Sequence, residues 1–267
     1  MAQTTTRSKS LTARYGAWAV VAGASEGLGA AFAERLGEAG FHLILLARRE
    51  PLLASLATGL RARHGVEVRT LACDLADPSF ASQLAPLAAE LDVGLAVYNA
   101  AYSFVGSFVD RPVDDLLRVV DVNVRGPLLF ARTLCPAMVA RGRGALVLMS
   151  SLAGAQGAPG LAAYAASKAF NTVLGESLWG ELRPRGVDVV TSCAGAIRTP
   201  GYAAAASRDA PGTLDASAVV DATLAALGGG PTVVPGAVNK LAAFAMQRLL
   251  PRARAIAIMR DSVSGLA

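Results

Sequence analysis

Short apolar runs recur along the chain, and longer stretches with helical spacing of their apolar residues lie between them. Few positions in the runs are polar, which suits parallel strands covered on both faces of a sheet. The predicted strands are Trp18–Ala22, Leu43–Leu46, Val66–Ala72, Leu95–Tyr98, Ala145–Met149, Val187–Ser192 and Thr232–Val234.

The intervening stretches predict amphipathic helices. Gly40, Gly65 and Gly186 follow three of them and mark helix ends. Alternation of strands with crossover helices predicts an α/β fold, a Rossmann-type doubly wound parallel sheet of about seven strands in three α/β/α layers. The predicted helices are Leu28–Ala39, Pro51–His64, Ala81–Glu90, Pro112–Val120, Pro127–Ala140 and Ala162–Arg183.

The pattern shows no linker and no internal repeat, so we expect one domain over residues 11–267 after a flexible tail at 1–10. A length of 267 residues with 53% hydrophobic positions supports one large core. Residues 199–213 are rich in small and turn-forming residues, and we expect a mobile loop or short helices over a site. Residues 239–260 form a basic amphipathic segment.

The net charge of +5 is concentrated near the C-terminus, where five basic residues follow position 238 against one acid, Asp261. Such a segment suits an anionic membrane surface or a subunit interface, or it is a surface helix with its arginines toward water. The body lacks a basic stripe interleaved with aromatic residues, which argues against nucleic-acid binding.

The sequence also indicates a compartment. It contains no run of 18 apolar residues, and its opening MAQTTTRSKS lacks the apolar core of a secretory signal. Three scattered cysteines fit neither a disulfide framework nor a metal site, and no His/Cys/carboxylate cluster suggests a metal. We therefore expect a cytoplasmic protein without a metal.

The first predicted strand leads into AGASEGLG at residues 22–29. Glycines in such a turn let backbone N–H groups approach a pyrophosphate, whose charge the following helix N-terminus favours. Tight packing is the alternative reason for glycines here. We expect the stretch to contact a dinucleotide through Gly23, Ser25, Glu26, Gly27, Leu28 and Gly29.

Arg48 and Arg49 follow the second predicted strand. An acid at this place would bind the ribose hydroxyls of NAD, whereas an arginine suits the 2′-phosphate of NADP(H) and can stack on adenine. The pair therefore favours NADP(H) and weakens a methyltransferase interpretation. Two ordinary surface arginines are the alternative.

Polar residues also follow the third and fourth predicted strands. Asp74, before Leu75, can accept a hydrogen bond from the adenine amino group, or it caps a helix. Asn99, before Ala100 and Ala101, can bridge the strand backbone and the cofactor, or it satisfies a buried turn.

The stretch YAASK places Tyr164 and Lys168 one helical turn apart on one face, and Ser151 lies just after the fifth predicted strand. Only three of the 25 basic residues are lysines, which makes Lys168 conspicuous. A tyrosine is a weak acid at neutral pH, but a neighbouring ammonium favours its phenolate. These three residues predict proton transfer to a carbonyl oxygen, which the serine orients.

AGASEGLG, NAA, SS followed by YAASK, and AGAIRT together resemble the short-chain dehydrogenase/reductase family over roughly residues 15–235. The resemblance implies a catalytic tetrad that adds Asn123, in DVNVRG, to Ser151, Tyr164 and Lys168. It implies that Tyr164 is the acid–base, that Lys168 binds the nicotinamide ribose and lowers the pKa of the tyrosine, and that Asn123 holds a relay water.

The same resemblance implies contacts from Ile197 and Thr199 to the nicotinamide carboxamide, and a homo-oligomer, a dimer or tetramer, formed by helices from the middle of the chain. Within the family, the N-terminal pieces are similar to bacterial hydroxysteroid dehydrogenases of the 7β type and to long-chain 3-oxoacyl reductases.

We therefore expect an NADP(H)-dependent oxidoreductase that interconverts a ketone and a secondary alcohol on a lipophilic, ketosteroid-like substrate. A 3-oxoacyl thioester reductase or a broad small-ketone reductase is the alternative, and a non-catalytic NADPH-sensing regulator is an alternative from another class. Apolar loop residues are expected to contact the substrate, namely Tyr102, Phe104, Leu152, Leu161 and Tyr202.

Overall fold

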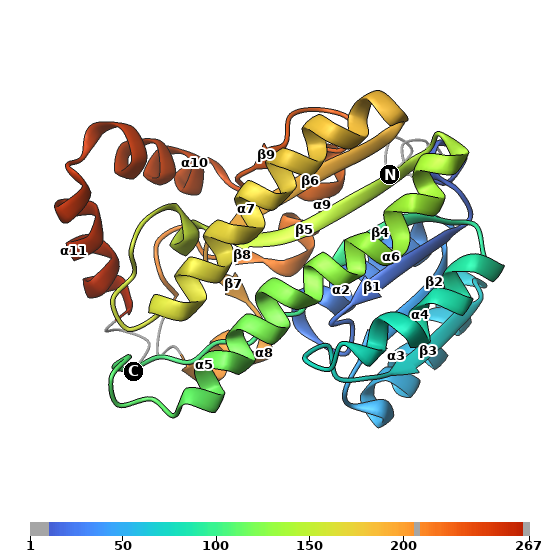
Figure 1. Ribbon diagram of the computed structural model, residues 1–267, viewed down its shortest axis with the longest axis horizontal. Helices are drawn as coiled ribbons and strands as arrows, with labels where there is room; N and C mark the ends of the chain where they lie inside the picture. The colour runs from blue at the N-terminus through green and yellow to red at the C-terminus, as the bar shows by residue number, and fades with distance from the viewer. Residues whose placement is uncertain (1–10, 206–208, 264–267) are drawn as a thin grey trace.

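The computed structural model describes residues 11–205 and 209–263. Seven parallel strands form one sheet in the order β3-β2-β1-β4-β5-β6-β9 (Figure 1). This confirms the predicted doubly wound sheet. The expected N-terminal tail at 1–10 lies outside the described residues. The strands are β1 (Trp18–Ala22), β2 (His42–Ala47), β3 (Val68–Ala72), β4 (Val93–Tyr98), β5 (Gly144–Ser151), β6 (Val187–Ala194) and β9 (Thr232–Val233).

Helices cover both faces of this sheet. The core on one face joins the strands to α2 (Gly27–Glu38), α3 (Glu50–His64) and α9 (Ala216–Ala225). The core on the other face joins them to α4 (Ser79–Glu90), α6 (Gly126–Arg141) and α7 (Ala162–Leu182). The result is the predicted three-layer arrangement.

Alternation along each strand feeds both cores. In β1, Val21 packs in the core with α2 and α3, whereas its neighbour Val20 packs in the core with α4 and α6, and both are fully buried. Successive side chains of a strand point to opposite faces, so a strand covered on both sides has to be apolar throughout. This is why the central strands read as continuous apolar runs.

Several predicted boundaries differ from the structure. The third strand begins at Val68, because Val66 and Glu67 precede the ladder that pairs β2 with β3. The strand β6 extends to Ala194, since its pairing with β5 continues to Ser151. Between α5 (Val113–Val120) and α6, the predicted interruption is instead a π-helical turn, η1 (Asp121–Arg125), which keeps the helix continuous.

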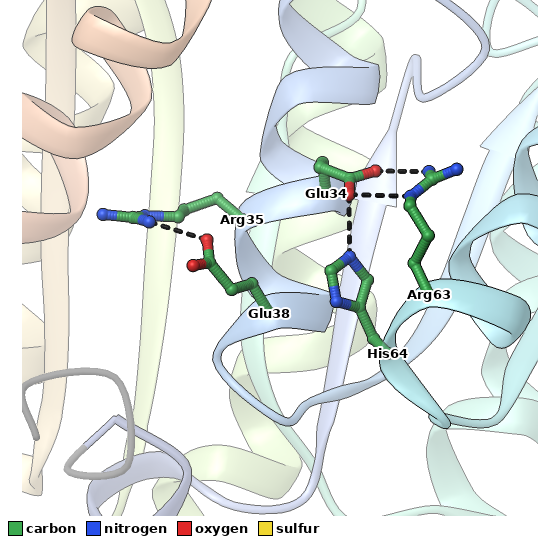
Figure 2. Close-up of polar contacts among 5 residues, drawn as sticks. All are labelled: Glu34, Arg35, Glu38, Arg63 and His64. Atoms are coloured by element: carbon green, nitrogen blue, oxygen red, sulfur yellow. Dashed lines mark hydrogen bonds and ion pairs between the residues drawn. The ribbon is translucent and has the colours of Figure 1, made fainter. Parts of the chain in front are cut away.

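Ion pairs join the helices on the face of α2. Glu34 on α2 lies 3.0 Å from Nε of Arg63 and 2.7 Å from Nε2 of His64, both at the end of α3 (Figure 2). Arg35 pairs with Glu38 on its own helix and, at 2.8 Å, with Asp221 on α9. The pairs are largely exposed and therefore contribute little individually to stability. They give His64, which the sequence left without a role, a place in helix packing.

The chain makes two excursions beyond the sheet. The predicted loop at 199–213 begins with α8 (Pro200–Ala205), and the short strands β7 (Ile197–Arg198) and β8 (Leu214–Asp215) pair at its base. Residues 206–208 of this loop lie outside the described residues.

The second excursion is the basic C-terminal segment, whose elements are α10 (Ala237–Phe244), the π-helical turn η4 (Ala245–Leu249) and α11 (Arg252–Val263). Figure 1 shows α10 and α11 at one end of the molecule, remote from β3. Within the described ranges, each helix is either too short or too polar to cross a bilayer.

Candidate active site

The strand order reverses beside β1, which pairs with both β2 and β4. In open α/β sheets, ligands bind outside the carboxyl ends of the strands at such a switch point. A cavity of about 330 Å³ lies there. It brings together most of the predicted cofactor residues, namely Gly23, Ser25, Glu26, Gly27, Leu28, Arg48, Arg49, Asp74, Leu75, Asn99, Ala100, Ala101 and Thr199.

Glycine is required in the turn that opens this cavity. Gly23 and Gly27 have φ angles of +80° and +56°, which other residues adopt at a cost. A Cβ at Gly29 would lie 1.9 Å from the Gly23 carbonyl oxygen, so α2 can begin directly over the turn only without one. Asn99 Nδ2 donates to that same oxygen at 3.0 Å. The turn is thus held against the end of β4, and the α2 N-terminus borders the cavity.

Two guanidinium groups line one end of the cavity, but their surroundings differ. Arg49 is paired with Glu26 at 2.6 Å and donates to the Ser25 hydroxyl at 3.1 Å. Arg48 forms no ion pair with a residue that the structure describes. Because Arg49 is already partly neutralised, Arg48 is the stronger candidate to hold a phosphate.

Asp74 makes two hydrogen bonds within the protein. Its Oδ1 accepts from the Ala76 N–H at 3.0 Å and its Oδ2 from Arg118 at 2.7 Å. Burial opposes ionisation of Asp74, but these two donors outweigh it and lower the pKa of the carboxyl group. Asp74 therefore closes a turn that precedes α4 (Ser79–Glu90) and does not cap that helix, and the adenine contact stays a prediction.

Ser151, Tyr164 and Lys168 lie on β5 and α7, and none of them is among the residues that line the cavity. Ser151 ends β5, Tyr164 comes from the first turn of α7, and the Ser151 hydroxyl acts to lower the pKa of the Tyr164 hydroxyl. Lys168 is buried, and its ammonium donates to the Met149 carbonyl at 2.9 Å and lies 5.5 Å from the centre of the Tyr164 ring. The predicted one-turn spacing thus places the ammonium next to the phenol ring.

Burial shifts the pKa of both groups. It raises the pKa of Tyr164, and the hydrogen bond with Ser151 acts in the opposite direction. Burial also lowers the pKa of Lys168 to about 8, because the charged ammonium loses its hydration. The expected lowering of the tyrosine pKa by Lys168 stays a prediction.

Asn123 lies in the π-helical turn η1 and is fully buried. Its Oδ1 accepts from the Tyr102 N–H at 2.8 Å, while its Nδ2 donates to the Tyr102 carbonyl at 2.9 Å and to the Ser167 hydroxyl at 3.0 Å. The side chain therefore ties the segment after β4 to α7. Its expected role in holding a relay water stays a prediction.

Ser150 and Ser151 have different surroundings. The Ser150 hydroxyl donates to the Lys168 carbonyl at 2.7 Å and lies 2.8 Å from the Thr172 hydroxyl, so it fixes α7 on β5. Ser151 accepts from the Ala153 N–H at 3.2 Å, and its hydroxyl acts to lower the pKa of Tyr164. The role of Ser151 as the catalytic serine stays a prediction.

The predicted substrate residues are spread around the site. Tyr102 lines the cavity and donates to Asp115, and Phe104 lies under the Arg111 guanidinium at 4.3 Å. Leu161 packs with Tyr164, and Leu152 begins the short 3₁₀ turn η2 (Leu152–Ala155) after Ser151.

Two further predicted residues belong to the loop around α8. Tyr202 lies on α8, and its hydroxyl accepts from the Ala210 N–H at 2.9 Å. Ile197 packs against the core with α2 and α9, and it does not line the cavity, unlike Thr199.

Other residues of the site were missed from the sequence. Arg118 on α5 lines the cavity, as do Val122, Pro200 and Gly201. Met259, near the end of α11, packs on the same three buried alanines as Tyr164. No local motif marks these positions, and only the folded chain brings them to the site.

Residues 17–210 match the family model described as short chain dehydrogenase. Very-long-chain 3-oxoacyl-CoA reductases from the fungi Laccaria bicolor and Podospora anserina are 38% and 40% identical over 181 and 179 residues. These matches include 66% and 65% of this chain but 54% and 53% of the relatives. The chain thus spans about half the length of the curated relatives it matches.

Solved structures show similar folds. A structure described in terms of 7beta-hydroxysteroid dehydrogenase stereoselectivity has a TM-score of 0.88 at 28% identity, covering 93% of this chain and 98% of that one. A short-chain dehydrogenase from Sphingobium yanoikuyae in complex with NADPH has a TM-score of 0.74 at 30% identity, covering 81% and 86%.

Replacing Lys168 with methionine tests its burial. In the unfolded chain, Lys168 has an ordinary pKa of 10.5, while in the folded protein it is about 8. The buried charge therefore destabilises the wild type below pH 8, and this cost disappears as the pH rises through 10.5. Between pH 7 and pH 9.5, we expect the unfolding free energy of the wild type to rise by about 1–2 kcal/mol relative to that of Lys168→Met.

Denaturant titration of the two proteins without added cofactor, at several pH values, measures this difference. Lys240→Met is the control, because it changes an exposed lysine on α10. A difference that is constant with pH for Lys168→Met would contradict the buried-ammonium assignment.

Proposed function

Since the chain belongs to the short-chain dehydrogenase family, we propose that it is an NADP(H)-dependent oxidoreductase that reduces a ketone to a secondary alcohol on a lipophilic substrate. The observation that carries the proposal is the buried Lys168 ammonium 5.5 Å from the centre of the Tyr164 ring, with Ser151 at the carboxyl end of β5, the same edge of the sheet at which the glycine turn follows β1. In this arrangement a hydroxyl acid, a second hydroxyl and an ammonium lie where a carbonyl would meet a nicotinamide.

The residues at the cavity fit such a cofactor. The turn at Gly23 and Gly29 has no space for a Cβ, which leaves its backbone open to a pyrophosphate. Arg48 and Arg49 border the same cavity and suit a 2′-phosphate. When bound, the reduced nicotinamide supplies the hydride that reaches the carbonyl carbon.

Tyr164 then donates its proton to the carbonyl oxygen as the hydride adds to carbon. The Ser151 hydroxyl donates a hydrogen bond to the same oxygen and stabilises the charge that develops there. Lys168 keeps a positive charge beside the ring, which favours the phenolate that Tyr164 becomes. The tyrosine regains its proton from solvent, and the reverse sequence oxidises the alcohol.

A long-chain 3-oxoacyl thioester is the substrate class we propose first. Its support is the similarity to fungal very-long-chain 3-oxoacyl-CoA reductases, which favours this alternative over the ketosteroid expected first. Apolar side chains beside Tyr164, including Leu161 and Met259, suit an alkyl chain.

A ketosteroid is the second candidate. It is supported by the similarity to the structure described for 7beta-hydroxysteroid dehydrogenase stereoselectivity, which extends over 93% of this chain. That extent includes more of the chain than the 66% matched by the fungal reductase from Laccaria bicolor. Both candidates present a ketone on a large apolar body.

A homo-oligomer is also proposed. Apolar side chains on the outer surface of the middle helices are exposed, including Leu117 on α5 (54%), Leu128 on α6 (43%) and Val173 on α7 (61%). Beside them, a groove between α6 and α7 is lined by Leu128, Cys135, Leu174 and Leu178. Contiguous apolar surface of this kind is typical of an interface between subunits.

The remaining expectations about the cell stay predictions. The C-terminal segment has exposed apolar residues, among them Leu241, Phe244 and Leu249, next to its basic residues, as contact with an anionic membrane would require. Neither this contact nor the cytoplasmic location follows from the geometry of the described residues.

Tyr164→Phe is expected to lower turnover at least ~1,000-fold, because it removes the hydroxyl that donates the proton while keeping the ring. NADPH oxidation with a panel of long-chain 3-oxoacyl thioesters, ketosteroids and small aryl ketones measures the effect. Binding of NADPH, followed by its fluorescence, should change less than threefold.

Two results would count against this assignment. Retained turnover in Tyr164→Phe would refute the role of the tyrosine. Tight NADPH binding by the wild type, with no turnover of any carbonyl in the panel, would instead favour the NADPH-sensing regulator.

Arg48→Ala is expected to weaken NADPH binding about 10- to 100-fold and NADH binding less than threefold, because it removes a charged donor to the 2′-phosphate alone. Titration with both cofactors measures the two dissociation constants. Arg185→Ala, which changes an exposed arginine on η3 (Arg183–Arg185), is the matched control. Equal losses for the two cofactors would refute the phosphate assignment of Arg48.

The double variant Leu117→Lys/Val173→Lys is expected to shift the protein to a smaller assembly, because two buried lysines would each cost several kcal/mol at an apolar interface. Light scattering coupled to size-exclusion chromatography measures the mass. Leu52→Lys, an exposed leucine on α3 in the opposite layer, is the control. An unchanged mass in the double variant would place the interface elsewhere.

A further inference from the structure

The C-terminal helix α11 packs on the segment that links Ser151 to Tyr164. Arg252 at the start of the helix donates to the Ala155 carbonyl at 2.8 Å. Further along the helix, Ile256 lies opposite Gly157, where an added Cβ would come within 3.5 Å of its side chain. The helix is therefore attached to the loop that carries the two catalytic hydroxyls at its ends.

The contacts come from one face of α11. Ala255 is fully buried and Val263 is 5% exposed, whereas Ile258 is 41% exposed. Positions 252, 255, 256, 259 and 263 recur at the three- and four-residue spacing of one helical face. Met259 is the centre of that face, and Ile258 belongs to the outer one.

Met259 and the catalytic tyrosine share a small packing cluster. Together with Leu161, they pack against three buried alanines, Ala153, Ala158 and Ala165. Leu161 and Met259 are thus the large aliphatic side chains that meet this cluster alongside Tyr164. Because alanines fill little space, the volume of these two side chains contributes most to the packing there.

This helix lies outside the part of the chain that the family model matches, which ends at residue 210. The catalytic groups and the residues that line the cofactor cavity all lie before that limit, whereas Met259 lies after it. Two parts of the chain with different degrees of family similarity thus meet at the alanine cluster that also packs against Tyr164. The part matched by the family model contains the catalytic residues, and the C-terminal part contributes the side chain of Met259 to this cluster.

We propose that Met259 is a specificity-determining residue, whose side chain limits the bulk of the substrate group that fits beside Tyr164. This inference rests on the proposed function, because it assumes a carbonyl positioned at the tyrosine. Methionine is unbranched and flexible, so it adapts to alkyl chains and to flat ring systems. A smaller residue at 259 enlarges the space and a larger one fills it.

The test compares Met259→Ala and Met259→Trp with the wild type. For each protein, kcat/KM is measured with NADPH for a ketosteroid and for acetophenone, and the ratio of the two values is taken. A change of several methylene equivalents in a pocket alters discrimination by roughly 10- to 200-fold. We expect the ratio in Met259→Ala to exceed that in Met259→Trp by at least ~10-fold, with the tryptophan variant retaining acetophenone turnover.

Matched controls use the outer face of the same helix. Ile258→Ala and Ile258→Trp change the neighbouring exposed residue and should leave the ratio within twofold of the wild type. Thermal unfolding of all variants separates specificity from stability, since a general loss of folding lowers both kcat/KM values together. Equal ratios in Met259→Ala and Met259→Trp would overturn the proposal.

A binding measurement separates this proposal from the proposed function. Calorimetric titration of a bile acid and of palmitate, in the presence of NADP⁺, needs no turnover. We expect Met259→Trp to weaken bile-acid binding at least ~10-fold relative to Ile258→Trp. If the wild type reduces no ketone, the proposed function is wrong, and the binding measurement alone then tests the role of Met259. Unchanged bile-acid binding in Met259→Trp would then overturn the role of Met259.

Discussion

The buried ammonium of Lys168 is the interaction on which the candidate site depends. A charge without water is costly, and here the Met149 carbonyl at 2.9 Å compensates part of that cost. To hold the ammonium there, α7 has to lie directly on β5, and Ser150 secures the same contact through the Lys168 carbonyl. The same packing places Tyr164 next to Ser151.

Close packing around this contact leaves little freedom. A Cβ at Gly154 would lie 2.6 Å from the Ala169 nitrogen, so the turn after Ser151 rests on the backbone of α7. The outer side of that turn carries α11 through Arg252. The layers from β5 to the C-terminal helix are thus stacked on one another, and the tyrosine lies at their centre. Lysine suits this place better than arginine, because its ammonium is compact and its pKa responds to burial.

Much of this arrangement was predictable from the sequence. The apolar runs predicted the strands, because a parallel strand that is buried on both faces of the sheet carries apolar side chains on both. The glycine turn and the YAASK spacing gave the cavity and the tyrosine–lysine pair, because both depend on residues close together in the chain. The differences arose where distant segments meet. Asp74 is held by Arg118, and Asn123 holds Tyr102, and neither partner is marked by local spacing.

Met259 illustrates the same limit. Helical periodicity shows that α11 has an apolar face, but not what that face covers. The charged residues of the sequence likewise do not show which of them form ion pairs, because Arg49 is neutralised by Glu26 only once the turn is folded. Local spacing therefore marks the tyrosine, the lysine and the glycine turn, while the side chains packed around them depend on tertiary structure.

Asn123 binds both the N–H and the carbonyl of Tyr102, the two groups a neighbouring strand would bind. The amide thus continues the hydrogen-bonding pattern of β4 past its end and fixes the root of the segment at 102–112. Beyond that root, the Gly106 N–H donates to the Gly160 carbonyl at 3.0 Å, in the loop that leads to Tyr164. A change in the backbone of this segment is therefore transmitted to the loop that positions the tyrosine.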